Sequence, residues 1–254
     1  IAASAASHSI LSPAFAAPLR KALIELGVEA LYSHQVQAME KIRQGRDILV
    51  ATPTASGKSL IFNLPVCEKI LENAATTALY LFPLKALAQD QLRSVQELIR
   101  SMQLEKPMSA AVYDGDTSVY RRGRMRENPP NILISNPDML HLSMLPYHGS
   151  WSSFWKNLRF VVLDEAHTYR GVFGSHVAWV IRRLQRICRL HGADPRFLLF
   201  SATVGNPETL GNDLLGRPVE LIGTTGAPRG NQHFILFDPL EGAASTASQM
   251  LEAA

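Results

Sequence analysis

Seven short runs along this chain are almost entirely apolar, and each is short for a helix. They lack a polar residue at every second position, which indicates strands covered on both faces rather than strands with one wet face. Turn-forming residues and longer helical patterns separate them. The runs span residues 47–51, 77–82, 108–113, 131–135, 160–164, 197–201 and 219–222.

Helical periodicity fills the intervals between these runs, most clearly in residues 58–73, 85–102 and 174–192. Alternation of buried strands with helices predicts an α/β domain with a mainly parallel sheet and helices on both faces. In the third helix we expect Ile181, Leu184, Ile187 and Leu190 to form the face that packs on the sheet, with the arginines outside. Ligands of such sheets bind beyond the carboxyl ends of the strands, which directs attention to the residues that follow each apolar run.

Composition permits an ordinary globular domain and restricts its setting. The chain has 254 residues, 46% of them hydrophobic, and its formal charge is 25 − 22 = +3, which allows a nucleic-acid partner without arguing for one. No apolar run approaches the length of a membrane span. Cys67 and Cys188 lie far apart and have no metal-ligand spacing. We therefore expect a reducing, cytoplasmic setting, no membrane contact and no zinc site.

The segment ATPTASGKSL, residues 51–60, follows an apolar run and opens a helical stretch. This is the context of a phosphate-binding loop, in which backbone N–H groups surround the phosphates, Lys58 reaches the β- and γ-phosphates and Ser59 ligates Mg²⁺. The strict pattern has glycine where this chain has Thr52. The alternative, a polar turn capped by Ser56, leaves Lys58 unexplained. The residues expected to contact ATP in this loop are Thr54, Ala55, Ser56, Gly57, Lys58 and Ser59.

Two adjacent carboxylates end the apolar run 160–164 in the segment FVVLDEAHTYRG. Buried like charges are costly unless a cation accompanies them. Beside a phosphate-binding loop that cation is Mg²⁺, so we expect Asp164 to hold the metal and Glu165 to polarise the attacking water. The alternative is an exposed acidic turn at a strand end. If Lys58 is disregarded, this alternative and a metal site are equally favoured.

Three of these segments, TPTASGKS, DEAH and SAT (201–203), occur in the order of motifs I, II and III and resemble those of superfamily 2 helicases. Gln35 in LYSHQVQAM resembles the adenine-reading Q motif, FPLKALAQDQ resembles motif Ia and SNPDML resembles motif Ib. With YDGDT and the extended DEAHTYRGVFGSH, the chain resembles the MrfA/YprA group of bacterial DNA-repair helicases, which are related to the Hrq helicases. The likeness covers about residues 20–240 and implies a RecA-like phosphate-loop NTPase domain.

The resemblance also implies roles for particular residues. His167 joins Lys58, Asp164 and Glu165 in the catalytic set, and with Ser201 and Thr203 it would couple nucleotide state to the grip on the strand. Nucleic acid would lie over the strand ends, where extended X-Pro steps expose backbone N–H groups. The basic residues 120–127 are a candidate extension of that path. The expected contacts are Pro83, Lys85, Ala86, Gly115, Asp116, Asn136, Pro137, Asp138 and Arg170.

As a whole, the resemblance implies the ATP-binding motor half of a 3′-to-5′ DNA helicase or translocase that acts in DNA repair. Polarity and repair role rest on the resemblance alone. An RNA-directed DExH helicase and a nucleotide-gated binding module without unwinding remain alternatives. We expect a tail at 1–18, the motor domain at 19–240, and at 241–254 a tail or the start of a linker. A second RecA-like domain, which would supply further motifs, is expected as a partner outside this chain.

Overall fold

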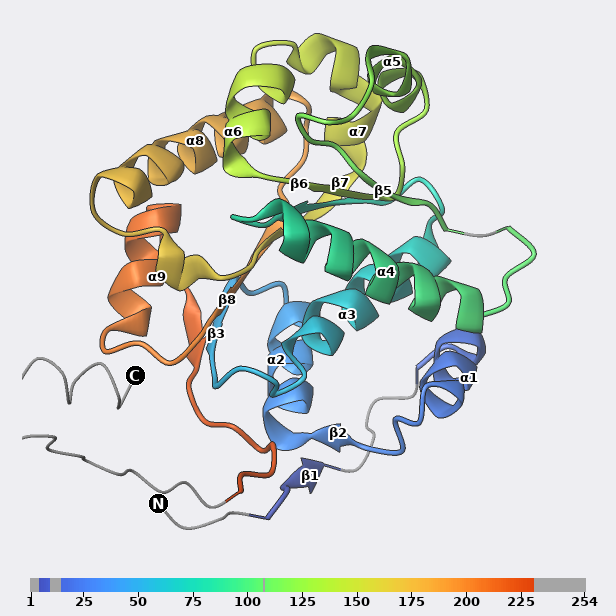
Figure 1. Ribbon diagram of the computed structural model, residues 1–254, viewed down its shortest axis with the longest axis vertical. Coiled ribbons are helices and arrows are strands. Elements are labelled where there is room, and N and C mark those ends of the chain that lie inside the picture. Colours follow the sequence, from blue (N-terminus) through green and yellow to red (C-terminus); the bar gives the residue numbers. More distant parts are fainter. Residues whose placement is uncertain (1–4, 10–14, 107, 231–254) are drawn as a thin grey trace, which may run out of the picture. The chain divides into compact units, whose positions relative to one another are not determined.

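A computed structural model of the protein describes residues 5–9, 15–106 and 108–230. Residues 7–227 form one compact unit around a seven-stranded sheet with the order β5-β6-β4-β7-β8-β3-β9 (Figure 1). Each neighbouring pair in this sheet is parallel, as the apolar runs predict. The strands are β3 (Ile48–Ala51), β4 (Thr77–Leu81), β5 (Ala110–Val112), β6 (Ile132–Ser135), β7 (Leu158–Leu163), β8 (Arg196–Ser201) and β9 (Glu220–Ile222).

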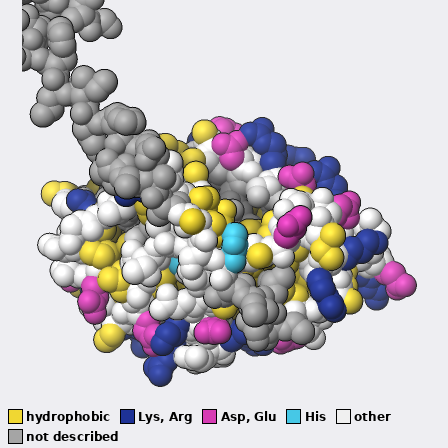
Figure 2. Space-filling view, turned by 90° about the horizontal axis from the view of Figure 1, so that it is seen from below, with side chains coloured by type: hydrophobic (Ala, Val, Ile, Leu, Met, Phe, Trp, Pro, Cys, Tyr) yellow, Lys and Arg dark blue, Asp and Glu magenta, His cyan; other side chains and the backbone are white. Residues whose placement is uncertain are grey.

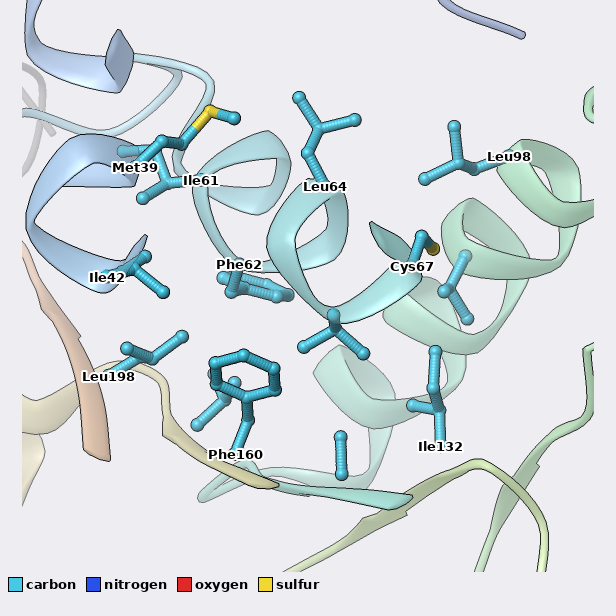
Figure 3. Close-up of a cluster of buried hydrophobic side chains, with 14 of the residues drawn as sticks. Met39, Ile42, Ile61, Phe62, Leu64, Cys67, Leu98, Ile132, Phe160 and Leu198 are labelled. Carbon is cyan, nitrogen blue, oxygen red and sulfur yellow. The ribbon is translucent and has the colours of Figure 1, made fainter. Parts of the chain in front are cut away.

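One face of the sheet is covered by four helices, α1 (Ala17–Glu25), α2 (Ser33–Arg43), α3 (Lys58–Glu72) and α4 (Lys85–Ser101). Their apolar side chains pack against alternate residues of the strands, such as Phe160 of β7 and Leu198 of β8. Figure 3 shows α3 between the sheet and its neighbours, with Phe62 turned toward these two strand residues. The helix that begins at the phosphate-binding loop is therefore fixed by the core.

The opposite face is covered by a second set of elements that enclose buried aromatic side chains. Trp151, Phe154 and Trp155 are fully buried here. The elements are α5 (Val119–Glu127), α6 (Pro137–Met139), the π-helical turn Leu140–Met144, the 3₁₀ turn His148–Trp151, α7 (Ser152–Asn157), α8 (Gly171–Leu190) and α9 (Pro207–Leu215). Because both faces are covered, the strands need no polar side.

The buried stripe of α8 differs from the one that the sequence spacing suggests. Ile181 and Leu184 are buried as expected, but Leu190 is 67% exposed and Cys188 is buried. Four residues spaced by three drift around a helix, because each residue turns about 100°, so Leu190 points about 180° away from Ile181. The prediction for Leu190 was wrong, and Cys188 takes the inward position in the last turn.

The N-terminal region contributes to the same unit earlier than residue 19. β1 (His8–Ser9) pairs in antiparallel fashion with β2 (Leu31–Tyr32), and Ser7 N–H donates to the carbonyl of Gly226. A Cβ at Gly226 would lie 2.4 Å from Ser33 Oγ, so only glycine lets the chain pass here without displacing neighbours. The expected linker at 241–254 lies outside the described residues. No helix in the described part is long and apolar enough to cross a membrane.

Candidate functional site

The phosphate-binding loop lies between β3 and α3, at the carboxyl edge of the sheet. Ala55 and Gly57 have φ values of 60° and 75°, and Gly57 immediately precedes the helix. A Cβ on Gly57 would lie 2.5 Å from Gln35 Nε2, which explains the glycine. The Thr52 hydroxyl lies 2.8 Å from that of Ser56, and both residues are buried. Thr52 thus braces the loop from inside, in the position where the strict pattern has glycine.

Lys58 connects this loop to the SAT segment. Its Nζ donates to the carbonyl oxygens of Thr52 and Ser201, both at 3.0 Å. Burial lowers the pKa of Lys58, while the nearby carboxylates of Asp164 and Glu165 act in the opposite direction. The lysine, the two acids and SAT therefore occupy one neighbourhood, as the order of the motifs predicts.

Gln35 lies directly behind the loop. Its side chain is buried, its Oε1 accepts from Tyr32 N–H at 2.8 Å, and its Nε2 donates to the carbonyl of Gly57 at 2.9 Å. Both amide atoms thus have protein partners, and the side chain ties the start of α2 to the phosphate-binding loop. Contact between Gln35 and adenine stays a prediction, and the second lone pair of Oε1 and the second N–H of Nε2 are left for it.

His34 is a residue that the sequence reasoning missed. Its ring is 1% exposed and joins two distant segments, because Nε2 lies 3.0 Å from the carbonyl oxygen of Ser56 and Nδ1 accepts from Gly226 N–H at 3.0 Å. These partners require the proton on Nε2 and a free pair on Nδ1, which is a neutral ring. The sequence signal was limited to the position of His34 beside Gln35.

The paired carboxylates follow β7 directly. Glu165 has φ 49°, and its backbone N–H donates to Asp164 Oδ1 at 2.8 Å. Burial raises the pKa of Asp164 to about 6; the carboxylate of Glu165 adds to this, whereas the bond from the Glu165 N–H and the charge of Lys58 oppose it. No hydrogen bond to Asp164 Oδ2 is formed within the described part of the chain. A carboxylate oxygen without a protein partner and the Ser59 hydroxyl are hard donors of the kind that Mg²⁺ takes, so the residues fit this ion.

His167 lies between the acidic pair and SAT. Its Nδ1 is 3.3 Å from Glu165 Oε2 and 3.3 Å from the backbone nitrogen of Ala202. An unprotonated Nδ1 accepts from Ala202 N–H, whereas a protonated Nδ1 donates to Glu165, so the ring cannot form both bonds in one protonation state. Ser201 is buried and Thr203 is exposed. The structure thus brings His167 and SAT together.

Only some of the residues predicted to contact nucleic acid lie close together in the structure. Lys85 Nζ lies 2.8 Å from Asp116 Oδ2, and this bond raises the pKa of the lysine. Lys85 and Asn136 also border one small hollow, so the loops after β4, β5 and β6 adjoin. Asn136 has extended backbone, as expected, but its side chain caps α6 by accepting from Met139 N–H at 2.8 Å. Pro137 is buried at the start of α6, and its contact with nucleic acid stays a prediction.

The remaining predicted contacts lie at different positions. Ala86 and Asp138 are exposed and Pro83 is partly buried. Arg170 instead borders a groove of about 940 Å³ between α8 and α9, together with Trp179. It shares none of the hollow that joins Lys85 to Asn136. Contact of these residues with nucleic acid stays a prediction.

A phosphate-binding loop facing an acidic pair at the carboxyl edge of a parallel sheet defines the class, a RecA-like nucleoside-triphosphatase domain. Within that class the order TPTASGKS, DEAH and SAT is specific to helicases. The chain belongs to the DEAD/DEAH box helicase family, which matches residues 32–210.

Comparison with individual proteins shows which helicases this chain is similar to. The chain is 49% identical over 221 residues to the uncharacterized ATP-dependent helicase YprA of Bacillus subtilis, covering 87% of this chain and 29% of that protein. It is 40% identical over 214 residues to ATP-dependent helicase HRQ1 of Saccharomyces cerevisiae, covering 83% of this chain and 20% of that protein. A crystal structure of the DUF1998 helicase MrfA bound to DNA and AMPPNP shares 46% identity and a TM-score of 0.87, covering 91% of this chain and 32% of that one. The chain thus spans a third or less of these proteins.

Proposed function

We propose that this chain is the ATP-binding motor half of an ATP-dependent DNA helicase or translocase that moves 3′ to 5′ and serves DNA repair in the cytoplasm. The observation that carries the proposal is the bond from Lys58 Nζ to the Ser201 carbonyl, beside Asp164. It places the phosphate-binding lysine in direct contact with the segment expected to transmit nucleotide state. MrfA, a structural relative, was solved with DNA and AMPPNP, which supports the same assignment.

The chemistry assigned to each residue follows from its position. Lys58, at the start of α3, offers an ammonium to the β- and γ-phosphates, and backbone N–H groups of the loop add to it. Ser59 and Asp164 would hold Mg²⁺, which neutralises charge on the phosphates when bound. Glu165 orients and polarises the attacking water. These roles rest on the fit of donor atoms and charges to a triphosphate.

Coupling is assigned to the contacts around SAT. Lys58 donates to the Ser201 carbonyl, and His167 Nδ1 bonds either Glu165 or the Ala202 N–H. A change at the phosphates that moves Lys58 or Glu165 therefore alters the hydrogen bonds of residues 201–203. We assign Thr203, which is exposed at the end of this segment, to the response of the strand path.

A second RecA-like domain of a longer protein is the proposed partner of this site. Arginines supplied across such an interface raise phosphoryl-transfer rates by roughly 10³- to 10⁵-fold. Because that contribution comes from outside this chain, we expect Mg-ATP binding with slow turnover when the chain is assayed alone.

The test measures Mg-ATP binding and turnover by this chain with and without single-stranded DNA. Lys58→Ala should abolish binding, whereas Glu165→Gln should preserve binding and remove the residual turnover. Lys69→Ala, which removes an exposed lysine of the same helix, is the matched control and should leave both quantities unchanged. Brisk DNA-stimulated turnover by this chain alone would overturn the half-motor proposal.

Competition between single-stranded DNA and RNA of the same sequence tests the choice of nucleic acid. Preferential retention of DNA supports the proposal, and preferential retention of RNA would assign the chain to an RNA-directed motor. Full-length protein that binds Mg-ATP but never hydrolyses it, even with DNA, would instead indicate a nucleotide-gated binding module.

A further inference from the structure

The helix α5 carries a concentration of positive charge that the proposed ATP site does not use. Its nine residues include four arginines and one glutamate, a formal charge of 4 − 1 = +3, which equals the formal net charge of the whole chain. None of these arginines forms an ion pair with a carboxylate in the described part of the chain. Figure 1 shows α5 at the top, whereas basic and acidic side chains lie interspersed on the face seen from below in Figure 2.

The proposed strand path itself has no excess of positive charge. Its charged side chains are Lys85 and Arg170 against Asp116 and Asp138, a balance of 2 − 2 = 0. Lys85 is moreover held by Asp116 at 2.8 Å, and Arg170 lies in the groove beside α8. Binding to a polyanion depends mainly on cations that face its phosphates. That attraction therefore has to come from an adjoining element.

α5 adjoins this path through Arg122. The Arg122 guanidinium donates from Nε to the Thr117 carbonyl at 2.8 Å and from Nη2 to the Asp114 carbonyl at 2.9 Å. It also lies over the Tyr113 ring, 5.6 Å from the centroid. Arg122 thus fixes the start of α5 to the YDGDT loop. Three carbonyl oxygens of that loop accept from Arg122, whereas the Gly115 N–H has no acceptor in the described part of the chain.

The first two turns of α5 present the remaining groups to solvent. Tyr120 is 73% exposed, Arg121 and Arg124 are also exposed, and Arg124 Nη1 lies 3.3 Å from the Tyr120 hydroxyl. An exposed tyrosine with one guanidinium at its hydroxyl, and a second exposed arginine three positions from the first on the same helix, form a combination suited to single-stranded nucleic acid, in which arginines contact phosphates and the ring stacks on a base.

We infer that Tyr120, Arg121 and Arg124 form a binding surface for the phosphate backbone of single-stranded DNA, continuing the path beyond Gly115. The inference rests on the proposed function for the direction of the path. It assigns the main electrostatic attraction to α5, not to Lys85.

The experiment measures the affinity of the intact chain for a fluorescein-labelled oligothymidylate by anisotropy at several KCl concentrations. Each phosphate contact on a single strand contributes about 0.7 to the slope of log affinity against log salt, so Arg121→Ala/Arg124→Ala should reduce the slope by about 1.4. Arg121→Lys/Arg124→Lys should retain the slope. Tyr120→Ala should weaken binding about 5- to 150-fold through lost stacking while leaving the slope unchanged.

The matched control is Arg100→Ala/Arg159→Ala, which removes two exposed arginines away from this edge. Arg100 lies in the last turn of α4 and Arg159 near the start of β7. The inference would be overturned if the control lost as much of the salt slope as the α5 double alanine variant. It would also be overturned if neither variant changed the slope. Unchanged Mg-ATP binding in every variant separates this failure from failure of the proposed function. A duplex of the same length is the second arm, and stronger dependence of duplex binding on Arg121 and Arg124 would contradict the single-strand assignment.

Discussion

Replacement of His34 by alanine tests whether the ring holds the phosphate-binding loop in place. The ring is buried and bonds the Ser56 carbonyl at one nitrogen and the Gly226 N–H at the other. Alanine removes both ring nitrogens, leaves the Ser56 carbonyl and the Gly226 N–H unpaired, and opens a void where water has little access. Unpaired buried polar groups cost about 1–3 kcal/mol each, so we expect His34→Ala to lower the free energy of unfolding by about 4 kcal/mol. For a chain of this size that corresponds to a fall in Tm on the order of 10 °C.

The effect should depend on pH with a definite sign. Burial is the main cause that lowers the pKa of His34 below its ordinary 6.5. The unfolded chain therefore takes up a proton that the folded chain resists, and the stability due to neutral His34 is lost as pH falls below 6.5 toward the folded pKa. His34→Ala lacks this dependence. The difference in unfolding free energy between the parent protein and the variant should shrink as pH falls, by at most about 1.4 kcal/mol per pH unit.

Urea unfolding at pH 8, 7, 6 and 5.5 measures both quantities. His176→Ala, which removes an exposed histidine of α8, is the matched control and should change stability by less than about 0.5 kcal/mol. His34→Gln retains one hydrogen-bonding group at about the same reach and should recover part of the loss. The reasoning is refuted if His34→Ala is as mild as the control, or if the difference grows as pH falls.

Three further predictions concern packing. Thr52→Val removes the hydroxyl that pairs with Ser56 and should cost about 1 kcal/mol in urea unfolding, whereas an unchanged value would mean that the pair adds nothing. Gly226→Ala places a Cβ within 2.4 Å of a side-chain oxygen and should cost about 1–3 kcal/mol, and a thermal scan showing no loss would contradict the close packing. Trp151→Ala should cost about 3–5 kcal/mol, but Trp179→Ala, at a site 67% exposed, should change unfolding by less than about 0.5 kcal/mol; equal losses would disprove the assigned burial.

The sheet was predictable because its strands are buried on both faces. Each of the seven apolar runs became a strand, with bounds that differ by two residues or fewer. The phosphate-binding loop and the acidic pair were predictable for a related reason. Strand ends of a parallel sheet meet at one edge, so residues that follow separate runs, such as Lys58 and Asp164, are brought together by the fold.

Contacts between distant side chains were not predictable in the same way. Nothing in the spacing of His34 and Gly226 reveals that 192 positions of chain close into one hydrogen bond. The hydrogen bond between Thr52 and Ser56 could not be predicted, because the pattern shows only that Thr52 replaces a glycine and not what the threonine contacts. The two-residue strands β1 and β2 are too short to leave a periodic signal.

Several groups predicted to meet ligands already have protein partners, and this changes how their energetics should be understood. Lys58 donates to the carbonyls of Thr52 and Ser201, and Lys85 is paired with Asp116. An ammonium has three N–H donors, so at Lys85 a phosphate oxygen has a donor of its own, and only the charge of Asp116 reduces the gain. At Lys58 two donors hold the carbonyls of Thr52 and Ser201 at 3.0 Å, and the third lies 3.5 Å from that of Pro53, which is the weakest acceptor to replace. A phosphate oxygen bound there would be joined through the same ammonium to residues 201–203.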